Sequence, residues 1–285
     1  MRGQIRDMTT RRDFLTTLGL TLGAAPLLRA LEPADDARKL PRIGLQLYTL
    51  RAMMEKDVEG TLAKVAGIGF KEVEFAGYFG RTPAQIRDAL KANGLTSPSV
   101  HIPLPASDDA WQKALDDAKS IGHEWVVMPW LLPEQRKEWE KLADRLNALA
   151  AMAKKTGLRF AYHNHDFEFA KVGKGTAYDV LLARTDPKLV EFEMDLYWVV
   201  KGGADPIHLF KHHPHRFPLL HAKDATPAPE RAITDVGSGT IDFAKIFSQH
   251  ALSGMKHVYV EHDSATDPIQ SATTGYNYLA KLKFK

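Results

Sequence analysis

The chain has 285 residues, of which 44% are hydrophobic and 26% charged, so it holds enough apolar material for a sizeable core. Its formal net charge of +3 and the absence of any run of lysine and arginine argue against a nucleic-acid partner. The chain has no cysteine, which excludes disulfides, thiolate nucleophiles and cysteine-bound zinc, and any metal must use imidazole, carboxylate or water.

The first segment, residues 1–37, is typical of a twin-arginine export signal followed by a linker. Arg11 and Arg12 precede a moderately apolar stretch, about residues 14–28, that contains Gly19 and Gly23. This stretch is short and glycine-rich for a membrane span. We therefore expect the twin-arginine machinery to export the protein, so that it is periplasmic or otherwise exported. A disordered basic leader and a membrane anchor are the alternatives.

From residue 43 onward, short apolar runs alternate with longer segments whose apolar residues recur at helical spacing. The longer segments carry start and stop signals of helices, such as Thr82 before Pro83 and Gly94 after the last turn. The predicted strands are, in chain order, Ile43–Tyr48, Glu72–Ala76, Ser97–Ile102, Trp125–Pro129, Arg159–His163, Val190–Asp195, Pro218–His221 and His257–Glu261. The helices predicted to follow them are Val58–Ile68, Pro83–Asn93, Asp109–Ile121, Pro133–Thr156, Tyr178–Arg184, Pro206–His212, Phe243–His250 and Ile269–Leu282.

This regular alternation predicts a parallel sheet covered by helices. Eight such units in one stretch favour a closed (β/α)8 TIM barrel over an open, doubly wound sheet. No glycine-rich phosphate loop follows any predicted strand, so the nucleotide-binding alternative lacks its main feature. We expect residues 38–285 to form a single TIM-barrel domain.

Ionisable side chains stand at the end of nearly every predicted strand. In a TIM barrel the active site lies at this C-terminal face of the strands. Charge is costly to bury there unless it is paired or bound to a metal. The residues at these ends are Glu74, His101, His163, His165, Glu193, Asp195, His221, Lys223, Glu261 and Asp263.

The alternation of side chains along each strand predicts which of them point into the barrel. Phe192 and Met194 would pack outward, which leaves Glu193 and Asp195 inside. The same rule directs Glu261 inward on the last strand. The strand ends should therefore bring several carboxylates and imidazoles together inside one barrel.

Four of these side chains are predicted to bind one divalent metal ion. They are Asp195, His221, Glu261 and a histidine of the fifth strand, which we take to be His163, with His165 as the alternative. A shell of two carboxylates and two imidazoles suits Mn, Zn, Fe or Co, and Mg is less favoured because of the nitrogen ligands.

Five motifs at these strand ends resemble those of the sugar phosphate isomerase/epimerase family, which has the xylose isomerase-like barrel. The resemblance covers residues 43–285, and the motifs occur in the family order. They are YHNHDFEF at 162–169, DLYWV at 195–199, HAKD at 221–224, VGSGTIDF at 236–243 and VEHD at 260–263.

The resemblance implies a metal bound by a carboxylate on strand five, an aspartate on strand six, a histidine on strand seven and a glutamate on strand eight. Asp195, His221 and Glu261 match these positions, whereas His163 stands where many members have glutamate. In those members the two glutamates also act as the acid/base pair. The imidazole of His163 therefore argues against a two-glutamate epimerase mechanism.

The expected reaction is aldose–ketose isomerisation or C3 epimerisation of a sugar, in which the metal polarises a carbonyl and stabilises an enediolate. Glu261 is the predicted base, and His163 or His165 would return the proton. A keto-sugar dehydratase or keto-glycoside lyase would share every step up to the enediolate. Export favours a free or oxidised sugar over a phosphorylated one.

Four further residues are predicted to contact the substrate. Glu74 and His101 have ordinary polar strand caps as their alternative, and Lys223 has simple pairing with the adjacent aspartate. Glu168, in the motif after strand five, is the fourth.

Two rival functions come from different classes. Phosphodiester hydrolysis on a related barrel would need extra histidines, and Trp198 stands three residues after Asp195, where such a metal cluster would require an imidazole. A non-catalytic, exported sugar-binding protein would bind its ligand without turnover and tolerate loss of Glu261. The sequence leaves the sugar, the metal and the oligomeric state open.

Overall fold

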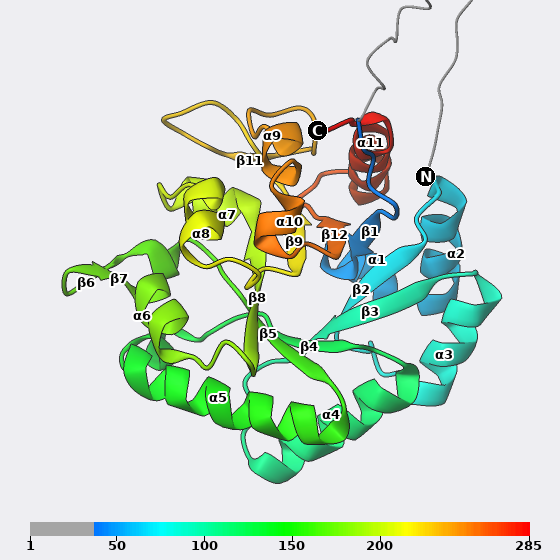
Figure 1. Cartoon of the computed structure of the whole chain (residues 1–285). Helices are drawn as coiled ribbons and strands as arrows, with labels where there is room; N and C mark the ends of the chain where they lie inside the picture. The colour runs from blue at the N-terminus through cyan, green and yellow to red at the C-terminus, as the bar shows by residue number, and fades with distance from the viewer. Residues whose placement is uncertain (1–36) are drawn as a thin grey trace, which may run out of the picture. The chain divides into compact units, whose positions relative to one another are not determined.

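The structure is a computed structural model that describes residues 37–285, and the predicted twin-arginine segment lies outside the described residues. Eight parallel strands close into a barrel in the order β1-β12-β9-β8-β5-β4-β3-β2 (Figure 1). The prediction of a single (β/α)8 TIM barrel is therefore confirmed. The barrel strands are β1 Gly44–Gln46, β2 Glu72–Ala76, β3 Thr96–His101, β4 Trp125–Met128, β5 Arg159–His163, β8 Val190–Asp195, β9 Leu219–Ala222 and β12 His257–Val260.

Helices follow the barrel strands and cover the outside of the barrel (Figure 1). Their ends carry the expected signals: the Thr82 side chain caps one helix in a capping box, and Gly122 and Gly157 end two others in the left-handed conformation. Within residues 37–285, no helix has both the length and the apolar character needed to cross a membrane. The α-helices are α1 Arg51–Met54, α2 Val58–Ile68, α3 Pro83–Ala92, α4 Asp108–Ile121, α5 Trp139–Thr156, α6 Ala177–Arg184, α7 Leu196–Lys201, α8 Pro206–His212, α9 Phe243–Phe247, α10 His250–Ser253 and α11 Pro268–Lys281.

The loops between barrel strands and helices contain further short elements. Two antiparallel hairpins, β6 Lys171–Val172 with β7 Gly175–Thr176 and β10 Asp224–Ala225 with β11 Ile233–Thr234, extend the loops after β5 and β9. The 3₁₀ helices are η1 Leu47–Leu50, η2 Pro133–Arg136 and η3 Phe167–Phe169.

Three helix predictions differ from the structure. The predicted helix 133–156 is interrupted between η2 and α5, where the Arg136 guanidinium donates back to the Leu131 carbonyl at 2.9 and 2.6 Å and turns the chain. The predicted helix 243–250 is divided into α9 and α10. The short helix α7 was not predicted, because its apolar run shows no helical period, and the Asp195 side chain starts it by capping the Trp198 amide.

The predicted alternation along the strands separates the apolar side chains into two groups. Phe192 and Met194 belong to the large core between barrel and helices, as expected. A smaller group fills the inside of the barrel and forms an apolar floor below the polar strand ends. Its members are Trp125, Val127, Ala161, Leu219 and Tyr259, all fully buried. Each large side chain so buried contributes about 1.5–3 kcal/mol.

The large ring in this floor depends on a glycine beside it. A Cβ on Gly44 would lie 2.3 Å from Cδ1 of Tyr259, so a larger residue in β1 would collide with the ring. Tyr259 can therefore fill the inside of the barrel only because its neighbour lacks a side chain.

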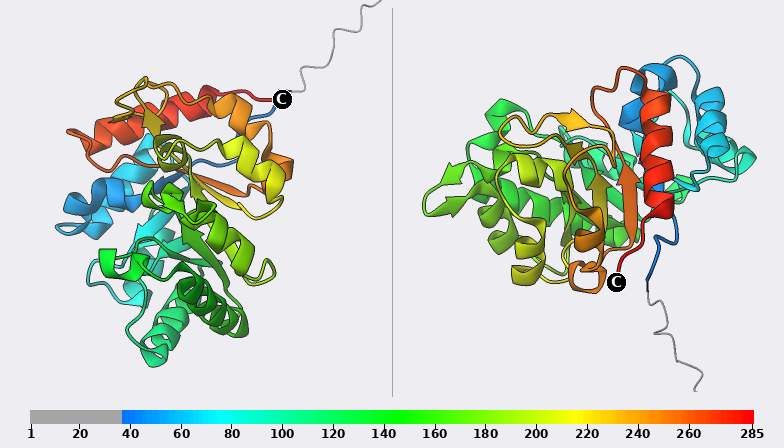
Figure 2. Two further views of the ribbon diagram at one scale, coloured as in Figure 1. Left: turned by 90° about the vertical axis from the view of Figure 1, so that its left-hand side faces the viewer. Right: turned by 90° about the horizontal axis from the view of Figure 1, so that it is seen from above.

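Backbone hydrogen bonds join the beginning and the end of the barrel domain. The amide of Arg38 donates to the Phe284 carbonyl at 2.7 Å, and the Phe284 amide donates back at 3.0 Å. The closing helix α11 lies beside the last strand, β12 (Figure 2). The last βα unit thus covers the seam where β12 pairs with β1.

Candidate active site

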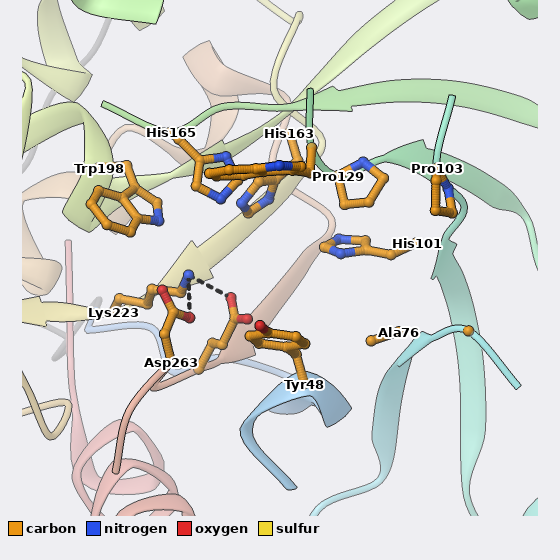
Figure 3. Close-up of a pocket in the computed structure, with 13 residues that line it drawn as sticks. Tyr48, Ala76, His101, Pro103, Pro129, His163, His165, Trp198, Lys223 and Asp263 are labelled. Carbon is orange, nitrogen blue, oxygen red and sulfur yellow. Dashed lines mark ion pairs between the residues drawn. The ribbon is translucent and has the colours of Figure 1, made fainter. Parts of the chain in front are cut away.

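A cavity of about 590 Å³ opens at the C-terminal ends of the strands, where active sites of TIM barrels lie. Figure 3 shows His163 and His165 along one side of this cavity and Lys223 with Asp263 on the facing side. Among the residues predicted for the site, those that line the cavity are His101, His163, His165, Lys223 and Glu261.

Local structure at the end of β8 fixes Asp195. Its Oδ1 accepts a hydrogen bond from the Trp198 amide at 3.0 Å, because Asp195 is the N-cap of α7. Its Oδ2 is left without a hydrogen-bond partner and lies 3.0 Å from the Lys223 ammonium. The cap therefore aims one carboxylate oxygen into the site.

Lys223 is buried among three carboxylates. Its Nζ lies 3.0 Å from Asp195, 2.9 Å from Glu261 and 2.8 Å from Asp263. Burial opposes the charge, but these carboxylates outweigh it and raise the pKa of Lys223 well above its usual range. The side chain is an ammonium that faces the cavity.

The alternative of simple pairing between Lys223 and Asp224 is not what the structure shows. The Asp224 carboxylate accepts hydrogen bonds from the amides of Gly237, Gly239 and Ile241, each at 3.0 Å. Asp224 thus holds the following loop in place and leaves Lys223 to the carboxylates of the site.

Three of the four predicted metal ligands meet. Asp195, His221 and Glu261 each offer a donor atom, and these atoms all lie within 4.8 Å of one another. Within this set, Nδ1 of His221 is 2.6 Å from Oε2 of Glu261. Buried carboxylate oxygen and imidazole nitrogen, one of them without a hydrogen-bond partner, fit the donor preferences of a divalent transition metal.

The fourth predicted ligand, His163, lies in a neighbouring set. Its Nε2 is 3.7 Å from Oδ2 of Asp195, but its Nδ1 is 2.9 Å from Glu193. The donor atoms of His163 group with those of His101, Glu193 and His221. The predicted ligand sphere is therefore divided, and His221 belongs to both halves.

Glu193 is the centre of this second set, and the sequence analysis gave it no role. One of its oxygens lies 2.7 Å from Nε2 of His101, 2.9 Å from Nδ1 of His163 and 3.1 Å from Nε2 of His221. The other oxygen is buried without a hydrogen-bond partner. The signal that could have found it is its position two residues before Asp195, on the same inward face of β8.

Comparison with known proteins agrees with this architecture. Residues 62–282 match the family described as "Xylose isomerase-like TIM barrel".

The chain belongs to the xylose isomerase-like TIM barrel family.

Relatives of this xylose isomerase-like barrel include curated inosose dehydratases. The one from Clostridium botulinum is 29% identical over 167 residues, which cover 50% of this chain and 54% of the relative. The chain thus spans about half the length of the first curated relatives it matches. An inosose dehydratase from Clostridium perfringens is 24% identical over 270 residues, 79% of this chain and 90% of the relative.

Solved structures share the fold. A sugar phosphate isomerase/epimerase from Parabacteroides distasonis ATCC 8503 superposes with a TM-score of 0.74 at 27% identity, covering 90% of this chain and 99% of the other. The IOLI protein, solved with a zinc atom, gives a TM-score of 0.64 at 14% identity over 83% of this chain and 95% of the other. At that identity it shows the fold alone.

Glu74 is fully buried and is not among the residues that line the cavity, so its contact with the substrate stays a prediction. Its Oε1 lies 2.6 Å from Nε2 of Gln46 and 2.7 Å from Nε2 of His221. Its Oε2 accepts from the Ser99 hydroxyl. Glu74 therefore supports the imidazoles from below. Together with Glu193 it overcomes the effect of burial and raises the pKa of His101 to about 9.

His165 stands on the cavity wall and carries a buried, unpaired nitrogen. Its Nδ1 has no hydrogen-bond partner, and its ring packs edge-on against Trp130 with centroids 4.5 Å apart. Burial, reinforced by the charge of Lys223, lowers the pKa of His165 far below its usual value. A neutral imidazole with a free nitrogen can donate to or accept from a ligand in the cavity.

Glu168 is likewise absent from the residues that line the cavity, and its contact with the substrate stays a prediction. The 3₁₀ helix η3 turns the fully buried side chain inward. There it accepts hydrogen bonds from the Tyr162 hydroxyl at 2.5 Å and from the His165 amide at 2.8 Å. Glu168 holds the loop that carries His165.

Replacing this carboxylate should change how stability depends on pH. Burial raises the pKa of Glu168 to about 7, from 4.5 ordinarily, so the folded chain keeps a proton that the unfolded chain loses between these values. The protonated Glu168 carboxyl therefore contributes its full stabilisation of the folded protein below pH 4.5, and this stabilisation is lost as the pH rises through 7. We expect the free energy of unfolding of Glu168→Gln to rise by about 2–3 kcal/mol relative to that of wild type as the pH increases from 4.5 to 8.

Denaturant unfolding of both proteins at pH 5 and pH 8 measures this difference. Glu124→Gln, at an exposed position, is the matched control and should follow wild type at both pH values. Parallel stability profiles for wild type and Glu168→Gln would contradict a protonated Glu168 in the folded protein.

Proposed function

We propose that this barrel is an enzyme that removes the proton α to the carbonyl of a keto sugar or keto polyol. The observation that carries the proposal is the arrangement across the cavity. The Glu261 carboxylate and the Lys223 ammonium lie 2.9 Å apart on one side, and the imidazoles of His163 and His165 lie on the other. A substrate between them would meet a base, a cation and an imidazole at once.

Each of these groups would have a role in the reaction that its environment in the site favours. Glu261 would take the α proton: Lys223 and His221 overcome the effect of burial and lower its pKa, so the carboxylate is ionised and free to accept a proton. The Lys223 ammonium would stabilise the negative charge that develops on the carbonyl oxygen. His165, whose Nδ1 is unpaired, would donate to or accept from a substrate hydroxyl.

A divalent cation belongs to this proposal. Asp195, His221 and Glu261 would hold it, and when bound it would polarise the carbonyl and an adjacent hydroxyl as a Lewis acid. The Lys223 ammonium already contacts two of these carboxylates, so cation binding would compete with that ion pair.

Two outcomes follow from loss of the α proton. Return of the proton gives isomerisation or epimerisation, as the solved isomerase/epimerase relative supports. Loss of a β substituent gives elimination, which the inosose dehydratase relatives support. The imidazole of His163 stands where a two-glutamate epimerase would have its second carboxylate, and this supports elimination as the second candidate function.

Deuterated water tests the proposal and separates its two outcomes. Metal-loaded protein is incubated with fructose, with an inosose and with a 3-keto-glycoside, and the products are followed by NMR. We expect deuterium at the α carbon of one substrate class, with an unsaturated product if elimination follows. Absence of both from every substrate would overturn the enzymatic proposal. Tight binding without either would support the sugar-binding alternative.

We also propose that the protein is exported by the twin-arginine route, on the strength of Arg11, Arg12 and the apolar stretch that follows. Cell fractionation of wild type and of the double variant Arg11→Lys, Arg12→Lys tests this. Export of wild type alone supports it, and equal distribution of both proteins contradicts it.

A further inference from the structure

Two exposed aromatic side chains stand at the rim of the cavity. In residues 37–285, the large hydrophobic side chains that are exposed are Tyr48 at 42%, Trp130 at 45% and Leu132 at 50%. Tyr48 and Trp130 line the cavity, whereas Leu132 does not. Exposed apolar surface gathered in a concave site marks a place where a ligand binds.

Each of these rings is held in a fixed orientation by an arginine. The guanidinium carbon of Arg51 lies 4.2 Å from the centroid of the Tyr48 ring, and that of Arg136 lies 4.6 Å from the Trp130 ring. Trp130 is also braced by His165, packed edge-on at 4.5 Å. An arginine packs on each ring, which is still partly exposed in the cavity, and a ring held in this way loses less entropy on binding.

The two rings come from distant parts of the barrel. Tyr48 follows β1 and Trp130 follows β4, and these strands lie three positions apart around the eight-stranded barrel. Trp198, after β8, also lines the cavity, and its indole N–H is buried without a hydrogen-bond partner. Figure 3 places Tyr48 across the cavity from His163 and His165. The outer half of the cavity, by which we mean the part lined by Tyr48 and Trp130, thus offers two aromatic rings and one hydrogen-bond donor without a partner.

These features fit a ring with apolar faces and an oxygen to accept a hydrogen bond. A pyranose presents C–H groups on its faces, and an aryl group presents a flat π surface, so both stack on tyrosine and tryptophan. The cavity of about 590 Å³ lies in the range for drug-sized ligands, which are larger than one sugar ring. One ring placed beside Glu261 and Lys223 would leave the outer half unfilled.

We propose that Tyr48 and Trp130 bind a second ring of the substrate, which is therefore a glycoside of the keto sugar and not the free sugar. The inference rests on the proposed function for the identity of the first ring. The second ring would lie between the two aromatic side chains, with its linking oxygen or a hydroxyl accepting from the Trp198 N–H.

Calorimetric titration with non-oxidised sugars tests this subsite without any turnover. The probes are glucose, cellobiose and p-nitrophenyl β-glucoside, the last two carrying a sugar or an aryl second ring. We expect both two-ring compounds to bind about tenfold more tightly than glucose. Trp130→Ala should lose about this tenfold difference while its affinity for glucose stays unchanged, and Trp130→Phe should retain most of it.

The matched control is Leu132→Ala, which removes an equally exposed apolar side chain from outside the cavity and should bind all three sugars like wild type. Two-ring compounds that bind no better than glucose, or not at all, would overturn the proposal. An equal loss of affinity for glucose and cellobiose in Trp130→Ala would also overturn it. Failure of α-proton exchange would leave this binding contrast intact, so the two proposals can fail separately.

Discussion

Glu261→Gln should lower the rate of α-proton exchange by about 10³-fold, within the range that a positioned general base supplies. Glutamine keeps the size of the side chain and a carbonyl oxygen near His221 and Lys223, but it cannot take a proton. The rate is measured by NMR as loss of the α-proton signal in deuterated water. Glu134→Gln, at an exposed position, is the matched control and should retain the wild-type rate.

Glu261 is also a proposed metal ligand, so two further properties of the variant must be measured beside the exchange rate. Metal content and melting temperature of Glu261→Gln separate loss of the base from loss of the site. A variant that exchanges the α proton within tenfold of wild type would show that another group is the base, and His165 would be the next candidate. A variant that binds metal like wild type but does not exchange the proton would support the proton-transfer role directly.

Lys223→Met should lower the free energy of unfolding by about 3–5 kcal/mol, the usual cost of removing one partner from a buried ion pair. The Lys223 side chain is 1% exposed and compensates three carboxylates within 3.0 Å, so its loss leaves their charges unpaired. For a domain of this size the melting temperature should fall by about 10 °C or more. Thermal unfolding followed by circular dichroism measures the change.

Lys113→Met is the control for this substitution, since the Lys113 side chain is 77% exposed and pairs with Asp117 on a helix surface. Its effect should stay below about 0.5 kcal/mol. A divalent cation should restore part of the stability of Lys223→Met, because Asp195 and Glu261 would then bind the ion in place of the ammonium. If Lys223→Met melts like wild type, the ion-pair cluster contributes little to the folded state.

The barrel could be predicted because its signals are local. Strand periodicity, helix caps and glycine stops each act over a few residues, and the alternation along β8 correctly placed Phe192 outside and Asp195 inside. The interruption at Arg136 could not be predicted from helical spacing, because its guanidinium both donates to the Leu131 carbonyl and lies 3.5 Å from the Phe167 ring in a different unit. The helix α7 was missed for a different reason, since its mostly apolar run shows no helical period.

The site could be predicted only as a set of strand ends. Which carboxylate meets which imidazole depends on the stagger of the strands, which places Asp195 beside His221 and Glu193 beside His163 along the sheet. The sequence also cannot show that η3 turns Glu168 away from the cavity. Glu168 and Glu74 are therefore residues whose type suggested the site and which the structure buries outside the lining of the cavity.

Anomalous diffraction from a crystal soaked with Mn²⁺ or Zn²⁺ tests most directly whether side chains from separate strands share a cation. We predict a single strong peak at about 2.0–2.2 Å from the donor atoms of Asp195, His221 and Glu261, with the Lys223 ammonium displaced from between the carboxylates. A fully loaded crystal with no peak among these three residues, or with its peak on the outside of the barrel, would contradict the account.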